Sequence, residues 1–486
     1  MKSSSPLKSI NYSETLLTEK NRTPPKAVIR VDKDPIHTPT QGIGINITLD
    51  GQAKDCYPDT PDQWKNLLSQ LSDLSPNWLC LTLPAQEVLT EKGELIKDSP
   101  IMRQFDHFCR WANDNKVDVD LMFPKSAPTW MRFQGLRSHS PAPRDLDAYA
   151  NMIAEAWRYF IKDKNYHCLK YATIFGEPFN EDGGDFSFGT PDGSDPYAYY
   201  IKMHETVRKA FDKQGLQQVG LMGPNSADVY AHLESFARTR KRKLDLAAPL
   251  AAIDLHTYRM RPDYMPPSHH IFTLGLTDYI EHLLKETVQG AKKAGKPCYI
   301  TELGCMYYGK SVYGDNRGPS RHECFIAEAE LIVRAFNLGM DGILKWVLLF
   351  NTTQLRGHYH LLELQNGAYV RKENYHGFSL LNRCQPKGTK VLKTELSFDA
   401  ETKPHCWTAA FLSPDGQLSI AIINDHPTNL VDAQINLDPA FAGKPLHHWV
   451  VDTWDKKVRK GTAGETNGPI QLRLTPLSLT VLTTAP

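Results

Sequence analysis

Tyr171-Ala-Thr-Ile-Phe-Gly-Glu177-Pro-Phe-Asn180 is a short apolar stretch that ends on a glutamate and is then broken by a proline. A second stretch, Pro297-Cys-Tyr-Ile-Thr-Glu302-Leu-Gly304, has the same design. Both patterns indicate a buried β-strand, and a carboxylate at the end of such a strand is costly unless solvent or a ligand meets it there. The sequence therefore predicts two strand-end carboxylates, Glu177 and Glu302, that come together in space.

Strand and helix patterns alternate through most of the chain. Apolar strand candidates lie at residues 42–48, 77–83, 117–123, 171–175, 218–223, 251–257, 297–302 and 341–347. Helical patterns fill the gaps; residues 62–74, for example, follow a capping box formed by Thr60 and Gln63. Eight such units predict an α/β fold, a (β/α)8 TIM barrel over residues 41–385. Glu177 then ends the fourth strand and Glu302 the seventh, at the end of the barrel where active sites lie.

The pattern changes after residue 385. Short strands separated by turns such as Ser413-Pro-Asp-Gly416 replace the helices, which predicts a C-terminal β-sandwich over residues 386–486. At the other end of the chain, residues 1–25 are polar and are expected to form a flexible tail. Residues 26–40 begin with an isolated strand pattern, and we expect this segment to join the sandwich.

The composition is that of an ordinary globular protein. The 486 residues are 41% hydrophobic and carry a formal net charge of +1, so neither nucleic acid nor an anionic membrane is expected as a partner. Nine cysteines are scattered without a CxxC pair, which is typical of a reducing compartment. With no signal-peptide core and no run of transmembrane length, the sequence predicts a soluble cytoplasmic protein, and it leaves the oligomeric state open.

Polar side chains also occupy the sixth predicted strand. Asp254, His256 and Tyr258 alternate along it and therefore share one face. We expect Tyr258 to reach the mouth of the barrel and to donate a hydrogen bond to Glu302. For His256, a place at the mouth and a place in a buried polar network are equally compatible with the sequence.

Four more residues are candidates for substrate contact. Trp346 ends the eighth strand, where its flat apolar face suits the C–H groups of a sugar ring, and Trp130 lies in the loop after the third strand. Asn180 follows Glu177 by three positions, and Asn225 follows the fifth strand. Each has an ordinary alternative, as a packed tryptophan or an exposed loop residue.

Together these motifs resemble the retaining glycoside hydrolases of the (β/α)8 clan A, especially families 30, 39 and 5. The matching pieces are Gly176-Glu177-Pro178, Ile300-Thr-Glu302-Leu-Gly304, His256-Thr-Tyr258, Pro128-Thr-Trp130-Met131, Trp346 and the C-terminal run Pro476-Leu-Ser-Leu-Thr-Val-Leu482. The resemblance implies that Glu177 is the acid/base and Glu302 the nucleophile of a double displacement on a carbohydrate. We expect neither a cofactor nor a metal.

Two positions depart from the clan pattern. Gly176 stands where the clan usually has an asparagine that holds the sugar 2-hydroxyl, and the second strand, Trp78-Leu-Cys80-Leu81, lacks the usual arginine. These departures leave open a non-catalytic carbohydrate-binding protein, and a transglycosidase would use the same residues as a hydrolase. A metal-dependent barrel hydrolase is disfavoured, because the first strand, at residues 42–48, has no histidine to hold the metal.

Overall fold

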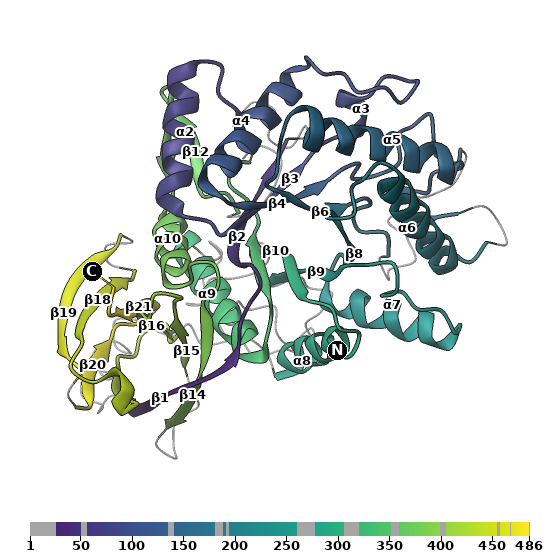
Figure 1. Cartoon of the computed structure of the whole chain (residues 1–486). Coiled ribbons are helices and arrows are strands. Elements are labelled where there is room, and N and C mark those ends of the chain that lie inside the picture. Colours follow the sequence, from purple (N-terminus) through teal and green to yellow (C-terminus); the bar gives the residue numbers. More distant parts are fainter. Residues whose placement is uncertain are drawn as a thin grey trace, which may run out of the picture.

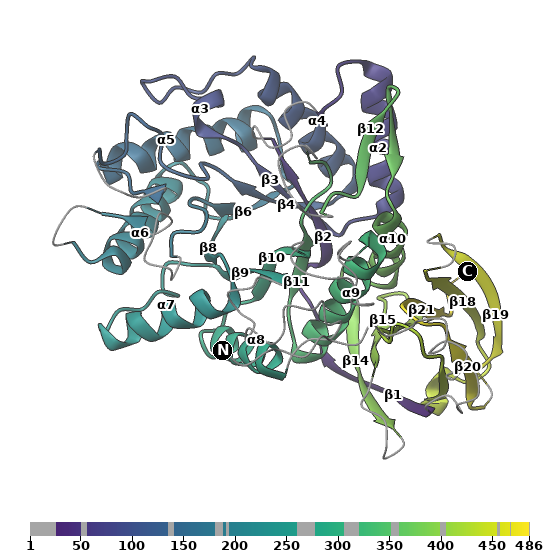
Figure 2. The ribbon, with the colours of Figure 1, turned by 180° about the vertical axis from the view of Figure 1, so that it is seen from behind.

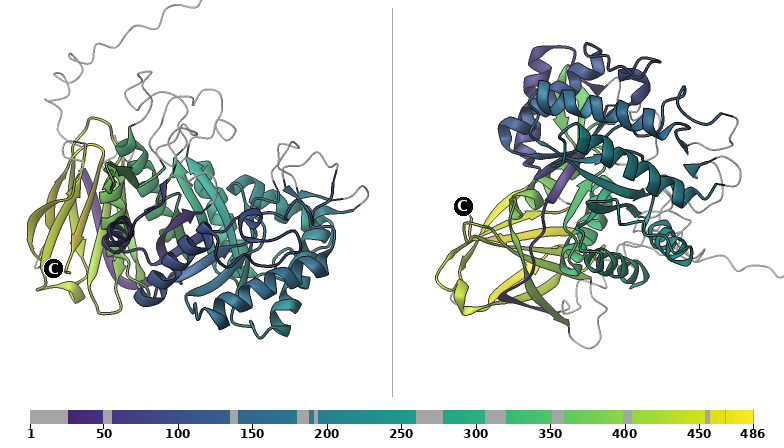
Figure 3. Two further views of the ribbon diagram at one scale, coloured as in Figure 1. Left: turned by 90° about the horizontal axis from the view of Figure 1, so that it is seen from above. Right: turned by 45° about the vertical axis from the view of Figure 1, so that its right-hand side comes forward.

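The structure is a computed structural model in which a barrel and a β-sheet domain lie side by side (Figures 1 and 3). It describes residues 26–49, 56–134, 140–179, 188–190, 194–259, 278–305, 320–350, 359–398, 405–453, 457–466 and 468–485. Within these ranges, no helix combines the length and the apolar character needed to cross a lipid bilayer.

Eight parallel strands close into a barrel, in the spatial order β2-β3-β4-β6-β8-β9-β10-β11. They are β2 (Gly42–Thr48), β3 (Trp78–Thr82), β4 (Asp118–Met122), β6 (Leu169–Thr173), β8 (Gly220–Ser226), β9 (Ala252–Arg259), β10 (Cys298–Cys305) and β11 (Gly342–Lys345). Spatial order follows chain order around the ring, as expected for a chain of βα units. The predicted (β/α)8 barrel is confirmed.

Helices form the outer layer around the barrel (Figure 2). They are α2 (Pro61–Leu74), α3 (Ala85–Val88), α4 (Pro100–Asn115), α5 (Leu146–Arg158), α6 (Pro196–Lys213), α7 (Val229–Lys241), α8 (Asp278–Lys293), α9 (Arg321–Leu338) and α10 (Glu373–Cys384). The capping box predicted before α2 is present, since the Thr60 hydroxyl accepts from the Gln63 N–H and the Gln63 side chain accepts from the Thr60 N–H. Short pieces β5 (Ser140–Pro141) with β7 (Phe188–Gly189), and the hairpin β12 (Leu362–Gln365) with β13 (Ala368–Arg371), complete the barrel domain.

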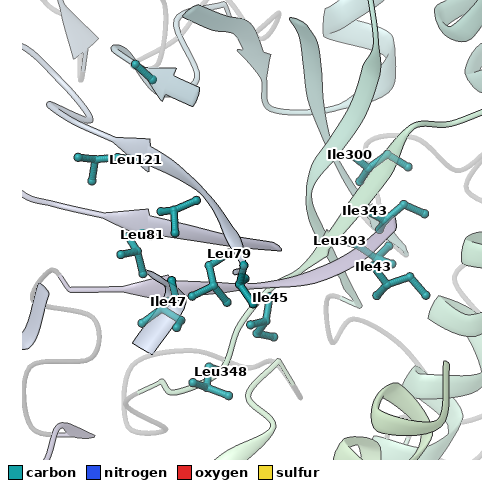
Figure 4. Packing of buried hydrophobic residues seen from close by; sticks show 14 of the residues in the cluster. Ile43, Ile45, Ile47, Leu79, Leu81, Leu121, Ile300, Leu303, Ile343 and Leu348 are labelled. Carbon is teal, nitrogen blue, oxygen red and sulfur yellow. The ribbon is translucent and has the colours of Figure 1, made fainter. Parts of the chain in front are cut away.

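The barrel strands are buried on both faces, which explains their nearly continuous apolar sequences. Side chains such as Ile45 and Leu79 lie close together (Figure 4) and belong to the core cluster that also contains side chains of the surrounding helices. A second cluster, which includes Trp78, Met222 and Tyr299, fills the inside of the barrel. Burying each large apolar side chain contributes about 1.5–3 kcal/mol, so this double burial fixes the strands that carry the site.

The second domain is one mixed sheet of nine strands, in the order β19-β18-β21-β16-β15-β14-β1-β17-β20. The strands are β1 (Lys26–His37), β14 (Lys390–Phe398), β15 (Cys406–Leu412), β16 (Leu418–Asn424), β17 (Val431–Leu437), β18 (Pro445–Val451), β19 (Arg459–Glu465), β20 (Ile470–Leu474) and β21 (Ser478–Thr483). The predicted C-terminal all-β domain is confirmed. Strand β1 pairs antiparallel with β14 and parallel with β17, so the N-terminal segment lies inside this sheet.

The two domains are joined through α9 and α10, which pack on one face of the sheet (Figures 1 and 2). Phe336 of α9 meets Phe411 of β15 edge-on at 6.1 Å between ring centroids. The side-chain amide of Asn337 donates to the Thr408 carbonyl at 2.8 Å. The sheet therefore braces the barrel on the side of the seventh and eighth βα units.

Candidate active site

Three side chains meet at the C-terminal end of the barrel. Glu177 follows β6, His256 lies on β9 and Glu302 lies on β10. The Nδ1 atom of His256 is 3.0 Å from Oε1 of Glu177 and 3.3 Å from Oε2 of Glu302. Ligand atoms of the three residues all lie within 4.8 Å of one another. The structure thus brings the two glutamates together and places His256 between them.

A β-bulge in β10 turns Glu302 toward the mouth. Against β9, Ile300 lies opposite Leu255 and Glu302 lies opposite His256, so Thr301 is an extra residue without a partner. In a regular strand Glu302 would share the face of Ile300, which packs in the core outside the barrel. A bulge changes the direction of the residues that follow it, and this one brings the glutamate beside His256.

A second bulge, in β8, supports the other glutamate. Pro224 lies opposite Asp254 and Ser226 opposite Leu255, so Asn225 is the extra residue, with a φ of 53°. Its backbone carbonyl and its side-chain oxygen both accept from the N–H of Glu177, at 3.1 and 3.3 Å.

Asn225 therefore holds the backbone of Glu177 through hydrogen bonds from a buried position. The Asn225 side chain is fully buried, and its contact with substrate stays a prediction from the sequence.

Asp254 lies beneath both bulges and is fully buried. Its carboxylate accepts from the N–H of Asn225 at 2.7 Å, from the Asn225 side chain at 2.6 Å and from the Thr301 hydroxyl at 2.8 Å. Burial raises the pKa of Asp254, while the hydrogen bonds from Asn225 and the charge of His256 act in the opposite direction. One carboxyl group thus connects the extra residues of two neighbouring strands.

The Tyr258 hydroxyl donates to Oε2 of Glu302, the hydrogen bond expected from the sequence. Gly304 makes this contact possible, because it lies opposite Tyr258 and a Cβ atom there would sit 2.6 Å from the tyrosine ring. Burial, together with the charge of Glu302, raises the pKa of Tyr258, so the phenol stays protonated and acts as a donor.

The two carboxyl groups lie in different surroundings. The Glu177 side chain is 34% exposed, whereas that of Glu302 is 8% exposed. Burial raises the pKa of Glu302; the charge of His256 opposes this rise and that of Glu177 reinforces it. Burial acts to lower the pKa of His256, but Glu302 and Glu177 outweigh it and the histidine pKa is raised.

Sequence reasoning missed Lys125, which lies in the loop after β4. The N–H of Gly176 donates to the Lys125 carbonyl at 2.7 Å, and a Cβ at position 176 would come within 3.2 Å of the Lys125 side chain. The charge of Lys125 acts to lower the pKa of Glu302. The sequence does contain a signal that could have identified Lys125. It is a positively charged residue that follows the third barrel strand, β4, at the end of the barrel where both glutamates were expected.

The three remaining candidates are Trp346, Trp130 and Asn180. Trp346 is buried with Phe350 and Tyr359, and this cluster also touches Tyr258, which bonds to Glu302. Trp130 packs against the main core, half-buried, and its indole N–H finds no hydrogen-bond partner in the part of the chain that the structure describes. Asn180 lies outside the described residues.

Glu177, His256 and Glu302 are also the residues that could hold a metal ion. An imidazole with two carboxylates is a donor set that zinc accepts in proteins. A metal here would take the Glu302 oxygen that Tyr258 now contacts and the His256 nitrogen that lies between the carboxylates. The three residues are therefore compatible with metal binding and with a metal-free pair of carboxylates held by His256 and Tyr258. An experiment has to separate these two possibilities.

No protein-family model matches the sequence, and no curated protein matches it either. Solved structures do match the fold. The catalytic domain of GH30 xylanase C from Talaromyces cellulolyticus has a TM-score of 0.67 at 13% identity, covering 94% of this chain and 99% of that one. The GH30 subfamily 8 xylanase Xyn30A from Clostridium acetobutylicum gives 0.64 at 13% identity, with the same coverage of 94% and 99%.

An α-L-arabinofuranosidase from Thermotoga maritima also matches, with a TM-score of 0.61 at 14% identity over 94% of this chain and 99% of its own. Each likeness extends through the barrel and the sheet domain together. The chain therefore has the fold of the clan A (β/α)8 glycoside hydrolases.

Proposed function

We propose that this chain is a retaining glycoside hydrolase that cleaves a glycosidic bond in an oligosaccharide, a polysaccharide or a glycoconjugate. The observation that carries the proposal is the approach of Glu177 and Glu302, because one carboxyl oxygen of each lies within 4.8 Å of the other. Retaining enzymes hold their two carboxyl groups about 5–5.5 Å apart, whereas inverting enzymes leave about 6.5–9.5 Å for a water molecule. The shape of the fold supports the same class of reaction.

In the proposed first step, a carboxylate oxygen of Glu302 attacks the anomeric carbon. The bond from that carbon to the leaving oxygen breaks, and the carboxylic acid of Glu177 gives its proton to that oxygen. In the second step, Glu177 takes a proton from water, the water oxygen bonds to the anomeric carbon, and the ester to Glu302 breaks. Glu177 regains its proton and the product keeps its anomeric configuration.

The surroundings of the two glutamates support this division of roles. Glu302 is the more buried and accepts a hydrogen bond from Tyr258, which favours a fixed carboxylate. Glu177 is the more exposed, so it can exchange protons with a leaving group and with water. His256 bonds to the carboxyl group of Glu177 and lies near that of Glu302, and it would fix the orientation of both groups.

Kinetics on a panel of nitrophenyl glycosides, with variants of each glutamate, test the proposal. Glu302→Ala should abolish turnover on every substrate, because no covalent intermediate can form. Glu177→Ala should keep part of its rate on a good leaving group, and added azide should restore turnover with retention. Glu155→Ala, at an exposed position on α5, is the matched control.

Four outcomes would contradict the proposal. A Glu302→Ala variant with the wild-type rate would show that Glu302 is not the nucleophile. An inverted product in the proton NMR spectrum would exclude double displacement. Binding of an oligosaccharide without turnover over days would favour a carbohydrate-binding protein that uses the same mouth. A product made by transfer to an added sugar would place the chain among transglycosidases.

Because the three side chains could also hold a metal, a metal-dependent hydrolase is the second candidate function. Dialysis against EDTA distinguishes the two, since the carboxylate mechanism keeps its rate without metal. A rate lost on dialysis and restored by zinc would support the metal-dependent candidate instead.

A further inference from the structure

A cavity of about 360 Å³ lies where the barrel domain meets the β-sheet domain. Helix α10 forms one wall and strands β16, β18, β19 and β21 form the other. Figures 1 and 2 show α10 beside these strands, on the side of the barrel that the sheet braces. Ligand sites commonly measure about 300–1,000 Å³ and often lie between domains. The cavity is thus large enough for a small ligand.

Positive charge reaches this cavity from both walls. Arg371 lies at the end of β13, Arg383 near the end of α10, and Lys460 on β19. Arg371 is paired with the carboxylate of Asp73, whereas Arg383 donates to the backbone carbonyl of Asp73 at 3.3 Å. Among the lining residues that the structure describes, none is acidic. A concave surface with this charge attracts anions.

Aromatic rings hold two of the cations in place. The Lys460 ammonium lies 5.0 Å from the centroid of the Trp449 ring, and the Arg371 guanidinium lies 4.7 Å from that of Tyr375. Such cation–π contacts contribute about 0.5–1 kcal/mol each at exposed sites. They also restrict the side chains before a ligand arrives, which lowers the entropic cost of binding.

Hydroxyl groups complete the lining. Ser419 and Thr483 share a hydrogen bond of 2.9 Å on the sheet wall, and Ser379 lies on the α10 wall. Partly exposed Trp449 adds apolar surface beside them. A mixture of cations, hydroxyls and an indole matches a ligand that carries an anionic group, hydroxyls and an apolar ring face.

We propose that this cavity binds an anionic saccharide, separately from the barrel mouth. Its carboxylate or sulfate group would meet Arg383 and Lys460, and its ring would lie beside Trp449. Arginine suits this task, because its planar guanidinium can donate two parallel hydrogen bonds to a carboxylate. The anionic part of the assignment rests on the charges of the cavity, and the saccharide part rests on the proposed function.

Isothermal titration calorimetry on the full chain tests the proposal, with Glu302→Gln present so that only binding is measured. The probes are a tetramer of galacturonic acid, neutral xylotetraose and inorganic phosphate. We expect the acidic oligosaccharide to bind, and to bind about tenfold more weakly when Arg383→Ala and Lys460→Ala are combined. The matched control combines Arg240→Ala with Lys241→Ala, an exposed pair on α7 that lies outside the cavity lining.

Raising the salt concentration should also weaken binding of the acidic oligosaccharide, because the contributing charges are exposed. Four results would overturn the proposal: no heat at millimolar ligand, equal affinity for xylotetraose, equal competition by phosphate, or unchanged affinity in the Arg383→Ala, Lys460→Ala variant. The last would show that Arg383 and Lys460 do not hold the ligand. If the chain proves to have no glycosidase activity, this test can still be carried out, because the titration measures binding and requires no turnover.

Discussion

The carboxylate of Asp254 accepts two hydrogen bonds from Asn225, at 2.7 Å from the backbone N–H and at 2.6 Å from the side chain. Asn225 in turn accepts from the N–H of Glu177. The same carboxylate accepts from Thr301, the residue directly before Glu302. One buried acid on β9 therefore holds the extra residues of two bulges, and each bulge adjoins one of the two glutamates.

We predict that Asp254→Asn lowers kcat/KM on an aryl glycoside by about 100-fold, because a shift of about 1 Å in a reacting group can have that effect. The asparagine offers a single oxygen where the aspartate offers two, so at least one of the donors on Asn225 and Thr301 loses its acceptor. The unfolding free energy should fall by only about 1–3 kcal/mol. Urea unfolding and steady-state kinetics on the same preparation separate the two effects.

Asp120→Asn is the matched control for that variant. Asp120 is equally buried inside the barrel, but its carboxyl group accepts from Thr173 rather than from either bulge. Burial raises the pKa of Asp120 well above its usual range, so the neutral amide resembles the protonated acid. If Asp254→Asn retained the activity of Asp120→Asn, a positioning role for Asp254 would be wrong.

Lys125 provides a prediction about pH. Its positive charge acts to lower the pKa of Glu302, so Lys125→Met should raise that pKa further. A nucleophile must be ionised, and the acidic limb of the kcat/KM profile should therefore move to higher pH in this variant. Lys125→Arg keeps the charge and should leave the limb in place. An acidic limb that does not move with Lys125→Met would show that the ammonium does not act on Glu302.

The sequence was sufficient to predict the barrel, because each of its strands is an apolar run followed by a helical pattern. It was also sufficient to propose Glu177, Glu302 and Tyr258 as neighbours, since ends of parallel strands meet at one edge of the barrel. The bulges at Thr301 and Asn225 could not be predicted in this way. Their existence depends on how β10 and β8 pair with β9, which no local pattern in either strand records.

The sheet domain shows the same limit. Strands β15, β16 and β21 have apolar sequences because α9 and α10 cover one of their faces while the other faces the core of the sheet. Strand β19, Arg459–Glu465, contains two glycines and almost no apolar residue, so its sequence carries no strand signal. It is formed by pairing with β18, a tertiary effect that overrides propensity.

A buried ion pair links the eighth strand of the barrel to α9. The Lys345 ammonium donates to Glu328 at 2.8 Å, and both side chains are fully buried. We predict that Lys345→Met or Glu328→Leu alone lowers the unfolding free energy by about 3–5 kcal/mol, because each leaves an unpaired buried charge. The double variant should cost much less than the sum of the two. Urea unfolding of all four proteins measures the coupling.

Arg158→Met is the control for this cycle, since the Arg158–Asp163 pair is about 40% exposed and such pairs contribute about 0–1 kcal/mol. Strictly additive effects of Lys345→Met and Glu328→Leu would show that the two charges do not depend on each other.

His204 supports a prediction about acid stability. It is fully buried in α6, with Nδ1 3.1 Å from the Tyr200 carbonyl, and burial lowers its pKa to about 4. Between that value and about 6.5, the unfolded chain binds a proton at this histidine that the folded chain does not. The unfolding free energy should therefore fall as the pH drops through this window, by up to about 1.4 kcal/mol per pH unit for each such histidine.

His204→Leu removes this contribution, so the slope of unfolding free energy against pH should become shallower between about pH 4 and about pH 6.5. The slope is the informative quantity, because the leucine also changes the packing and shifts the whole curve. Urea unfolding at several pH values in this window gives it directly. His282→Asn, at an exposed position on α8, controls for the loss of a histidine as such. Parallel curves for wild type and His204→Leu would show that His204 takes up its proton equally well in the folded chain, against the effect of its burial.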